Sequence, residues 1–227
     1  MAVYDKNGNI IAGGGGESGS PISGKKIILI GDSNTQYNGA GWKTAIEEKY
    51  GCVFTPFGYA GATWETANGT STTENTSAVG KVNQIIAPYV DSGIADNYDY
   101  ILIMMGTNCG TVGEVTDTSA NVSTMCGAIR YCLEKLLYYY RAKTIGVILP
   151  PQRAEGNSGQ LTRNNLIKAL CDEYSVPTYD FYHQGQVVPD AKTPDGTNYY
   201  LFDGLHFGGN GGNLFINKIG KWVAYVL

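Results

Sequence analysis

"KIILIGDSNT", residues 26–35, is the stretch that decides the fold. Its unbroken apolar run is typical of a strand buried on both faces of a parallel sheet. The run leads directly into a glycine, an acid, a serine and an asparagine, which favour a tight turn or a helix cap. This polar cluster therefore lies at the carboxyl end of a predicted strand, the edge where open α/β sheets bind ligands.

Apolar runs of the same kind alternate with helical patterns along the rest of the chain. This alternation predicts right-handed βαβ units and an α/β fold, in which helices cover both faces of a central parallel sheet. Besides 26–30, the predicted strands are 52–57, 100–105, 144–150 and 176–181. The predicted helices are 40–49, 79–90 with its end signalled by Pro88, 119–141, a segment around 166–174, and a last helix from Leu214 to Val226.

The chain has 227 residues, a length that predicts one folded domain. Its first 24 residues contain an Asn-Gly pair suited to a short hairpin, followed by a Gly/Ser stretch with the composition of a flexible linker. We therefore predict a flexible Gly/Ser-rich arm over residues 1–24 and a folded domain over residues 25–227.

Charge and hydropathy exclude several classes of partner. The formal charge is -4 and there is no basic run, so neither nucleic acid nor an anionic membrane is an expected partner. No apolar run reaches the roughly 18–20 residues that cross a bilayer, and the first residues lack the pattern of a secretory signal. We expect a soluble protein of unknown compartment and oligomeric state.

Metal and cofactor motifs are missing from the sequence. There are two histidines and no H-E-x-x-H, and the five cysteines contain no C-x-x-C pair, so we predict no metal or cofactor and expect reduced, buried thiols. "GSPISGKK" (19–26) has the spacing of a phosphate loop, but Lys26 occupies the position of the magnesium-binding hydroxyl. The glycines also precede a strand, where a phosphate loop would join a strand to a helix.

Four short segments carry the residues suited to catalysis: "GDSN" (31–34), "YAGAT" (59–63), "GTN" (106–108) and "DGLH" (203–206). We expect them to follow the first three strands and the last strand. Ser33 is a candidate nucleophile at a helix N-terminus, where the helix favours developing negative charge. His206 is the candidate base, and Asp203 is spaced to bind its Nδ1 and orient it.

Acyl transfer also needs donors for an oxyanion. The backbone N–H groups of Ser33 and Gly61 and the side-chain amide of Asn108 are candidates. Each residue alone also has an ordinary structural interpretation: a helix cap at Ser33, a positive φ at Gly61, a turn at Asn108. His183 is interpreted as structural or as lining the rim of a site. Their joint occurrence in order favours the catalytic interpretation.

Together these segments resemble the blocks of the SGNH (GDSL-type) hydrolase family over residues 26–227. "GDSNT" lacks the second glycine of the G-x-S-x-G elbow, so it does not fit the α/β-hydrolases. The SGNH resemblance implies a flavodoxin-like three-layer α/β/α sandwich with about five parallel strands. It also implies that Ser33, Asp203 and His206 form the catalytic triad, with Gly61 and Asn108 as oxyanion donors. One departure is Cys109, which replaces the acid of the family's usual G-T-N-D block.

The predicted function is a serine esterase that hydrolyses carboxylic esters, with small acyl groups such as acetyl on a carbohydrate as the favoured substrate. Other interpretations remain open: a silent carbohydrate-binding or structural domain of a larger assembly, or a lipase, thioesterase or acyltransferase. Aromatic rings near the blocks suit stacking on sugars. Tyr59, Trp64 and Tyr200 are the predicted substrate contacts, with Tyr37, Trp42 and Tyr199 nearby.

Overall fold

The computed structural model describes residues 3–4, 10–12, 19–66, 75–92 and 97–227. Two short antiparallel strands come first in the chain, β1 (Val3–Tyr4) and β2 (Ile10–Ala12). The elements that follow are β3 (Lys26–Gly31), α1 (Ser33–Tyr50), β4 (Val53–Gly58), α2 (Ala78–Ser92), β5 (Tyr100–Met104), α3 (Met125–Tyr139), β6 (Thr144–Leu149), α4 (Asn157–Glu173), β7 (Thr178–Asp180), α5 (Phe181–Gln184) and α6 (Gly209–Tyr225).

The central sheet has five parallel strands in the order β4-β3-β5-β6-β7. This arrangement confirms the predicted α/β fold with a parallel sheet of about five strands. The chain proceeds from β3 outward to β4 and then returns to β5 on the other side of β3. The carboxyl ends of β3 and β5 therefore flank a topological switch point, which is where such sheets leave a crevice for ligands.

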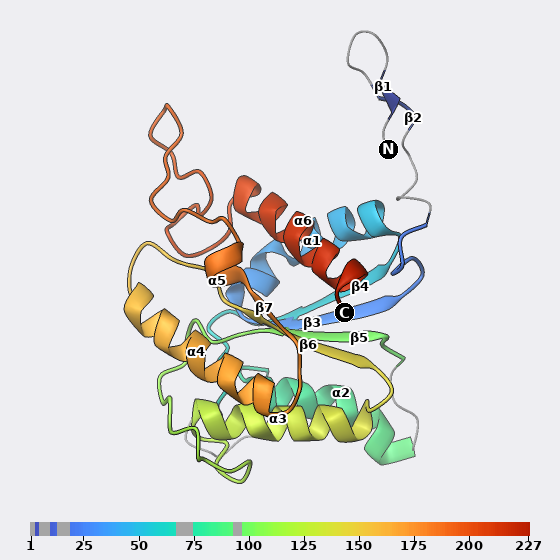
Figure 1. Cartoon of the computed structure of the whole chain (residues 1–227), viewed down its shortest axis with the longest axis vertical. Helices are drawn as coiled ribbons and strands as arrows, with labels where there is room; N and C mark the ends of the chain where they lie inside the picture. Colours follow the sequence, from blue (N-terminus) through green and yellow to red (C-terminus); the bar gives the residue numbers. More distant parts are fainter. Residues whose placement is uncertain (1–2, 5–9, 13–18, 67–74, 93–96) are drawn as a thin grey trace.

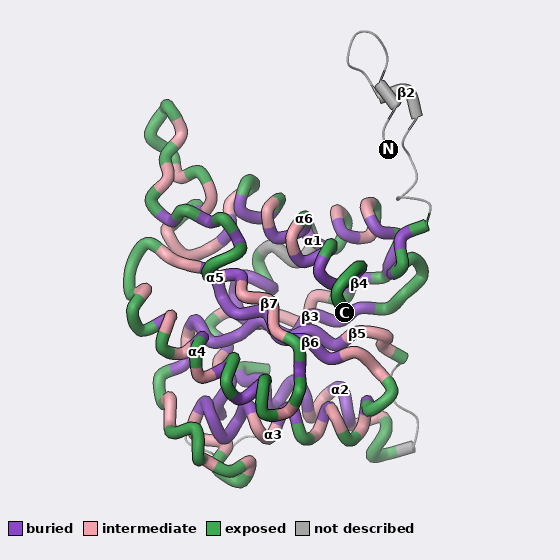
Figure 2. Tube along the Cα trace, viewed as in Figure 1, coloured by how far each residue is buried: buried purple, intermediate pink, exposed green. Residues whose placement is uncertain are grey.

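Helices cover both faces of this sheet, with α1 and α6 on one face and α2, α3 and α4 on the other (Figure 1). Strand β3 shows why. Ile27 and Leu29 pack with α1 and α6, whereas Ile28 and Ile30 point into the opposite core. Because successive side chains of a strand point to opposite faces, a run of four apolar residues needs two cores. The buried residues accordingly concentrate in the strands and the inner helix faces (Figure 2).

Two helices begin elsewhere than predicted because side chains cap them. Helix α1 begins at Ser33, well before residue 40, since Asp32 accepts a hydrogen bond from the N–H of Asn34 at 3.0 Å. Helix α3 begins at Met125 and not at 119, since the hydroxyl of Thr124 accepts the N–H of Gly127. Short-range capping of this kind decides helix ends more than hydrophobic periodicity does.

Helix α2 continues through Pro88 to Ser92, so the prediction that this proline ends the helix is wrong. Proline removes one backbone hydrogen bond, but a tertiary contact holds the last turn in place. The ring of Tyr89 packs edge-on against Tyr139 of α3, with centroids 5.1 Å apart. The short helix α5 was not predicted, and α4 and α6 begin earlier than their periodic residues indicated.

The predicted arm, residues 1–24, is described only in part. Its Asn7-Gly8 pair and its Gly/Ser stretch 13–18 lie outside the described residues, so the expected flexibility remains a prediction. Strands β1 and β2 pair with each other. Ile22 is fully buried in the core beneath α1 and α6, so residues 19–24 pack with the folded domain.

All five cysteines are buried and free, which confirms the predicted buried thiols. Burial raises the pKa of Cys52 to about 11 and that of Cys171 to about 12, so these groups stay protonated at neutral pH. Over the ranges that the structure describes, no helix combines the length and the apolar character needed to cross a bilayer.

Candidate active site

Ser33 is the first residue of α1, and a single residue, Asp32, separates it from Gly31 at the end of β3. A Cβ atom on Gly31 would lie 2.0 Å from the hydroxyl of Thr35 and 3.0 Å from the carbonyl oxygen of Met104, so only glycine fits there. The first N–H groups of a helix have no intrahelical acceptor and carry partial positive charge. Ser33 therefore combines a hydroxyl with a backbone donor at the positive end of α1.

Asp32, the cap of α1, is a buried carboxyl next to this serine. Burial raises its pKa from 3.8 to about 6, even though hydrogen bonds from Asn34 and Thr107 and the nearby His206 act in the opposite direction. The ionised form of Asp32 is thus destabilised by its loss of water, and its hydrogen-bond partners offset this cost only in part.

His206 lies in the loop before α6 and faces both other members of the predicted triad. Its Nε2 is 2.8 Å from Oγ of Ser33, and its Nδ1 is 2.6 Å from Oδ2 of Asp203. These distances allow Ser33 to donate to a neutral imidazole whose Nδ1–H donates to the carboxylate. The arrangement can move a proton from the serine hydroxyl to the histidine.

Asp203 holds this loop through its second oxygen as well. Oδ1 accepts the backbone N–H groups of Leu205 at 3.0 Å and of His206 at 2.7 Å. Partial burial acts to raise the pKa of Asp203, but these hydrogen bonds and the bond to the His206 ring outweigh it and lower the pKa. The carboxyl is therefore ionised at neutral pH, as an orienting acid must be.

The D-x-x-H segment comes after the last strand in the chain, as expected, but does not follow it directly. Strand β7 ends at Asp180, and both α5 and a long connection intervene before Asp203. The segment reaches the carboxyl edge of the sheet because its loop precedes α6, which packs beside α1. Tertiary packing and not strand topology places it there.

The two predicted oxyanion donors lie on adjacent loops. Gly61 has φ +77°, in the left-handed region that favours glycine, within a turn closed by the N–H of Ala62 donating to Tyr59 at 3.0 Å. The side-chain amide of Asn108 donates to the carbonyl oxygen of Ala62 at 3.1 Å. This bond brings the Asn108 amide beside the Gly61 turn.

The Gly61 turn in turn lies against the start of α1. The backbone N–H of Tyr59 donates to the carbonyl oxygen of Gly31 at 3.2 Å, and that of Ala60 donates to the side chain of Gln36. The loops after β4 and β5 thus both approach the Ser33 end of α1. The backbone N–H groups of Ser33 and Gly61 and the Asn108 amide thus belong to neighbouring segments at this end of α1, and their role as oxyanion donors remains a prediction.

The predicted aromatic contacts have mixed outcomes. Tyr59 is exposed and Tyr200 is half-buried, packed edge-on against Tyr199. Trp64 is fully buried, and its indole N–H donates to the carbonyl oxygen of Met105 at 3.0 Å. The predicted contact between Trp64 and substrate is therefore wrong, because its ring fills the space between the two loops. Trp42 is also buried.

Two other exposed rings contact the imidazole directly. Tyr37 meets His206 edge-on with centroids 5.3 Å apart, and Phe202 stacks on it at 5.6 Å. Phe202 was missed by the sequence analysis, although its position next to Asp203 is a signal that it lies near the site. His183, by contrast, is exposed on α5 and pairs with Asp180. The described ranges hold no group of three metal-ligating side chains.

The model of the GDSL-like lipase/acylhydrolase family matches residues 29–213, a span that contains all of these segments. The chain belongs to this family. The finding confirms the resemblance drawn from the sequence, and it makes the protein an ester-bond hydrolase. A catalytic triad and an oxyanion hole are general features of the family. Among curated proteins, none matches the sequence.

Solved structures share the fold at low identity. A Lactobacillus plantarum protein has a TM-score of 0.68 and 19% identity, over 89% of this chain and 97% of its own. A possible lipase from Chitinophaga pinensis has a TM-score of 0.59 and 16% identity, over 86% of this chain and 96% of its own. A variant of an acetyl xylan esterase from Geobacillus stearothermophilus has a TM-score of 0.53 and 16% identity, over 89% of this chain and 96% of its own. At these identities the likeness shows a common three-layer fold.

Asn34 also belongs to the site, and its part there was not identified from the sequence. Its Oδ1 accepts the N–H of Phe207 at 3.0 Å, and its Nδ2 donates to the carbonyl oxygen of Leu205 at 3.5 Å. The side chain thus binds the backbone on both sides of His206 from the residue next to Ser33. The adjacency to Ser33 in the sequence was the signal available.

Glu65 is a second missed residue, and it bears on the departure at Cys109. Its Oε1 accepts the N–H of Gly110 at 2.8 Å and that of Thr111 at 3.4 Å, while the sulfur of Cys109 accepts the N–H of Trp64. Burial raises the pKa of Cys109 well above its usual value, and the Glu65 charge raises it further. A carboxylate from the neighbouring loop therefore holds the Asn108 loop where the family's usual acid is absent.

Proposed function

We propose that this protein is a serine esterase that removes small acyl groups, acetyl above all, from saccharides. One observation carries the proposal: His206 lies 2.8 Å from the Ser33 hydroxyl while its other nitrogen lies 2.6 Å from Asp203. A serine hydroxyl is a weak nucleophile unless a base removes its proton. Here the base and the group that orients it are already in hydrogen-bond contact.

The first half of the reaction transfers the acyl group to the enzyme. Oγ of Ser33 attacks the ester carbonyl carbon as its proton passes to Nε2 of His206, and Asp203 stabilises the imidazolium. The carbonyl oxygen becomes an oxyanion that accepts hydrogen bonds from Ser33 N–H, Gly61 N–H and the Asn108 amide. Collapse expels the alcohol oxygen, which takes the proton from Nε2 and leaves an acyl group on Oγ.

The second half returns the enzyme to its starting state. Water attacks the acyl carbon, and Nε2 of His206 takes one of its protons. The same donors hold the second oxyanion. When this intermediate collapses, Oγ of Ser33 departs and recovers its proton from His206, and the carboxylic acid is released.

Three features support a small acyl group on a polar alcohol. A cavity of about 400 Å³ beside the catalytic loop is lined by Arg153, Glu155 and Asp203, which suit a hydroxyl-rich molecule better than a lipid. One protein of the same fold is an acetyl xylan esterase. Exposed aromatic side chains near His206 also fit sugar rings.

The test compares the purified wild type with Ser33→Ala on 4-nitrophenyl acetate, a longer 4-nitrophenyl ester and an acetylated xylo-oligosaccharide. We expect turnover of the acetyl esters by the wild type and a loss of about 10⁴-fold or more in the variant. Retained activity in Ser33→Ala would overturn the assigned nucleophile. Equal rates on short and long acyl chains, with no release of acetate from the saccharide, would overturn the assigned substrate.

A further inference from the structure

We propose that the groove between α1 and the start of α6 is a subsite for a sugar ring of the ester's alcohol. The cavity has a volume of about 440 Å³, and its lining includes Tyr37, Phe202, Gly208, Gly209 and Asn213. Volumes of this order are typical of small-molecule sites. The proposal rests on the esterase function above and specifies where that substrate binds.

The chemistry of the reaction decides which half of the ester lies on this side. Nε2 of His206 must protonate the departing alcohol oxygen, so that oxygen has to come within about 3 Å of the imidazole. The alcohol is therefore on the His206 side, and the acyl oxygen faces Gly61 and Asn108. A groove that adjoins His206 receives the alcohol portion of the substrate.

Two aromatic rings connect the groove to His206. Tyr37 is 59% exposed and Phe202 is 58% exposed, and each contacts the imidazole as well as lining the groove. Exposed aromatic side chains that gather beside a cavity are typical of a ligand-binding surface. Their faces suit the apolar C–H faces of a pyranose, which bind aromatic rings.

Two of the elements that line the groove, Trp42 and the start of α6, carry N–H groups that lack a side-chain acceptor in the described part of the chain. Trp42 is 2% exposed, and its indole N–H, close to Gly212, has no partner within the described part of the chain. Helix α6 begins at Gly209 with no side-chain cap on its first N–H groups. An unpaired buried donor is unfavourable, so a ligand with acceptor oxygens is favoured.

These two features together select the class of ligand. An alkyl chain would cover the rings but leave the Trp42 and α6 donors unpaired, whereas a purely polar ion would leave the rings in water. A pyranose ring has apolar faces and hydroxyl oxygens at its edge, so it satisfies both. The groove is therefore fitted to a saccharide alcohol next to the acetylated position.

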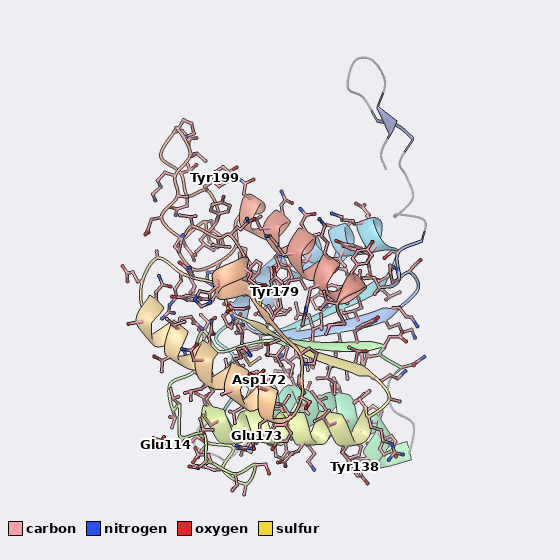
Figure 3. All side chains as sticks on the ribbon, in the orientation of Figure 1. Glu114, Tyr138, Asp172, Glu173, Tyr179 and Tyr199 are labelled. Carbon is pink, nitrogen blue, oxygen red and sulfur yellow. The ribbon has the colours of Figure 1, made fainter. Side chains whose placement is uncertain are left out.

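The experiment measures kcat/KM for an acetylated xylo-oligosaccharide relative to that for 4-nitrophenyl acetate. Tyr37→Ala removes one ring, and Asn213→Trp places a bulky side chain from α6 at the lining of the groove. The matched control is Tyr138→Ala, an exposed tyrosine on α3 at the opposite face of the sheet (Figure 3). We expect the ratio to fall about tenfold in the first two variants, through KM, and to stay constant in the control.

Several outcomes would overturn the subsite. If Tyr37→Ala lowers both activities equally, the ring acts only on His206; if Asn213→Trp leaves the ratio unchanged, the groove is empty during catalysis. An equal loss with octyl acetate would make the groove a general apolar site. Should the wild type cleave no saccharide ester, the proposed substrate fails, and calorimetry of Ser33→Ala with unacetylated xylotriose tests the groove separately. Absence of binding there, or binding unaffected by a further Asn213→Trp, would also refute it.

Discussion

The chain contains two D-x-x-H segments whose local geometry is nearly the same. In the first, Asp203 binds Nδ1 of His206 at 2.6 Å and accepts its backbone N–H at 2.7 Å. In the second, Asp180 binds Nδ1 of His183 at 2.7 Å and accepts its backbone N–H at 3.1 Å. Three-residue spacing is therefore enough to form an oriented Asp–His pair.

Everything beyond the pair differs. The imidazole of His206 is 15% exposed and bonds to Ser33, whereas that of His183 is 56% exposed and has a tyrosine ring as its neighbour. Only the first pair has Asn34 bound to the backbone on both sides of the histidine. The comparison teaches that short-range sequence builds an oriented Asp–His pair, and that long-range packing brings one of the two pairs to a serine.

The largest expected effect separates the two histidines. We expect His206→Ala to lower kcat on 4-nitrophenyl acetate by about 10⁴-fold, because no other base reaches the Ser33 hydroxyl within the described residues. His183→Ala is the matched control and should leave the rate within about twofold. Steady-state kinetics of both variants test this, and similar losses in the two would remove the distinction between the pairs.

Substitutions of the two acids, Asp203 and Asp180, should differ in their effect on kcat in the same direction as those of the two histidines, but by a smaller factor. Asp203→Asn keeps an acceptor for the backbone but removes the charge that stabilises the imidazolium, and we expect kcat to fall by about 10²–10³-fold. The loss is smaller than for the histidine because Asp203 is 41% exposed and water screens its charge. Asp180→Asn should retain full activity. A silent Asp203→Asn would show that the loop alone orients His206.

Asp32 lies near the first pair only, and it should make stability depend on pH. Its pKa is raised from 3.8 to about 6 by burial, so between these values the native state holds a proton that the unfolded chain has lost. Stability from this group is thus complete below pH 4 and is lost as pH rises through 6, by about 3 kcal/mol.

Asp32→Asn keeps a capping side chain and abolishes this titration. Urea unfolding at pH 4 and pH 8 should therefore show the variant gaining about 3 kcal/mol relative to the wild type at the higher pH. Asp195→Asn, at an exposed carboxyl in the loop before Asp203, is the control that should show no such gain. A constant difference between wild type and Asp32→Asn at both pH values would contradict the raised pKa.

The smallest expected effect concerns Asn34, which distinguishes the environment of His206 from that of His183. Asn34→Ala should lower kcat about tenfold with little change in KM, because the base loses the two bonds that hold its loop. Asn164→Ala is a matched control, since Asn164 of α4 is similarly buried, donates to the carbonyl oxygen of Pro150 and accepts from Gln160. Equal losses of stability with equal kcat values would assign Asn34 a purely structural role.

Much of the fold was predictable from particular segments. The apolar runs of β3, β5 and β6 each required two covered faces, and that requirement indicated a parallel sheet between helix layers. Helix ends were less predictable, because Asp32 and Thr124 cap through hydrogen bonds that periodicity does not register. The prediction that Pro88 ends its helix failed for a different reason: the contact between Tyr89 and Tyr139 holds the helical turn beyond the proline.

The candidate site divides in the same way. The sequence identified five residues with chemistry suited to acyl transfer, namely Ser33, Gly61, Asn108, Asp203 and His206. Their catalytic roles remain predictions. The sequence did not identify Glu65, because its partner Gly110 is distant in the chain, and it missed Phe202 although this ring stacks on His206 only a few residues away. It also misassigned Trp64, since an aromatic residue has the same sequence signal whether it is exposed or buried.

By itself the sequence determined the alternating α/β architecture, the membership of the GDSL-like family, and the Asp–His pairs, because backbone periodicity, short motifs and three-residue spacing act over short distances. The sequence also predicted that His206 and not His183 faces Ser33, but only the tertiary structure brings the two side chains into contact. That contact depends on α6 packing beside α1 and on Asn34 binding the chain around His206, across 173 residues of separation between Asn34 and Phe207. Contacts of that separation are set by burial and hydrogen-bond satisfaction in three dimensions.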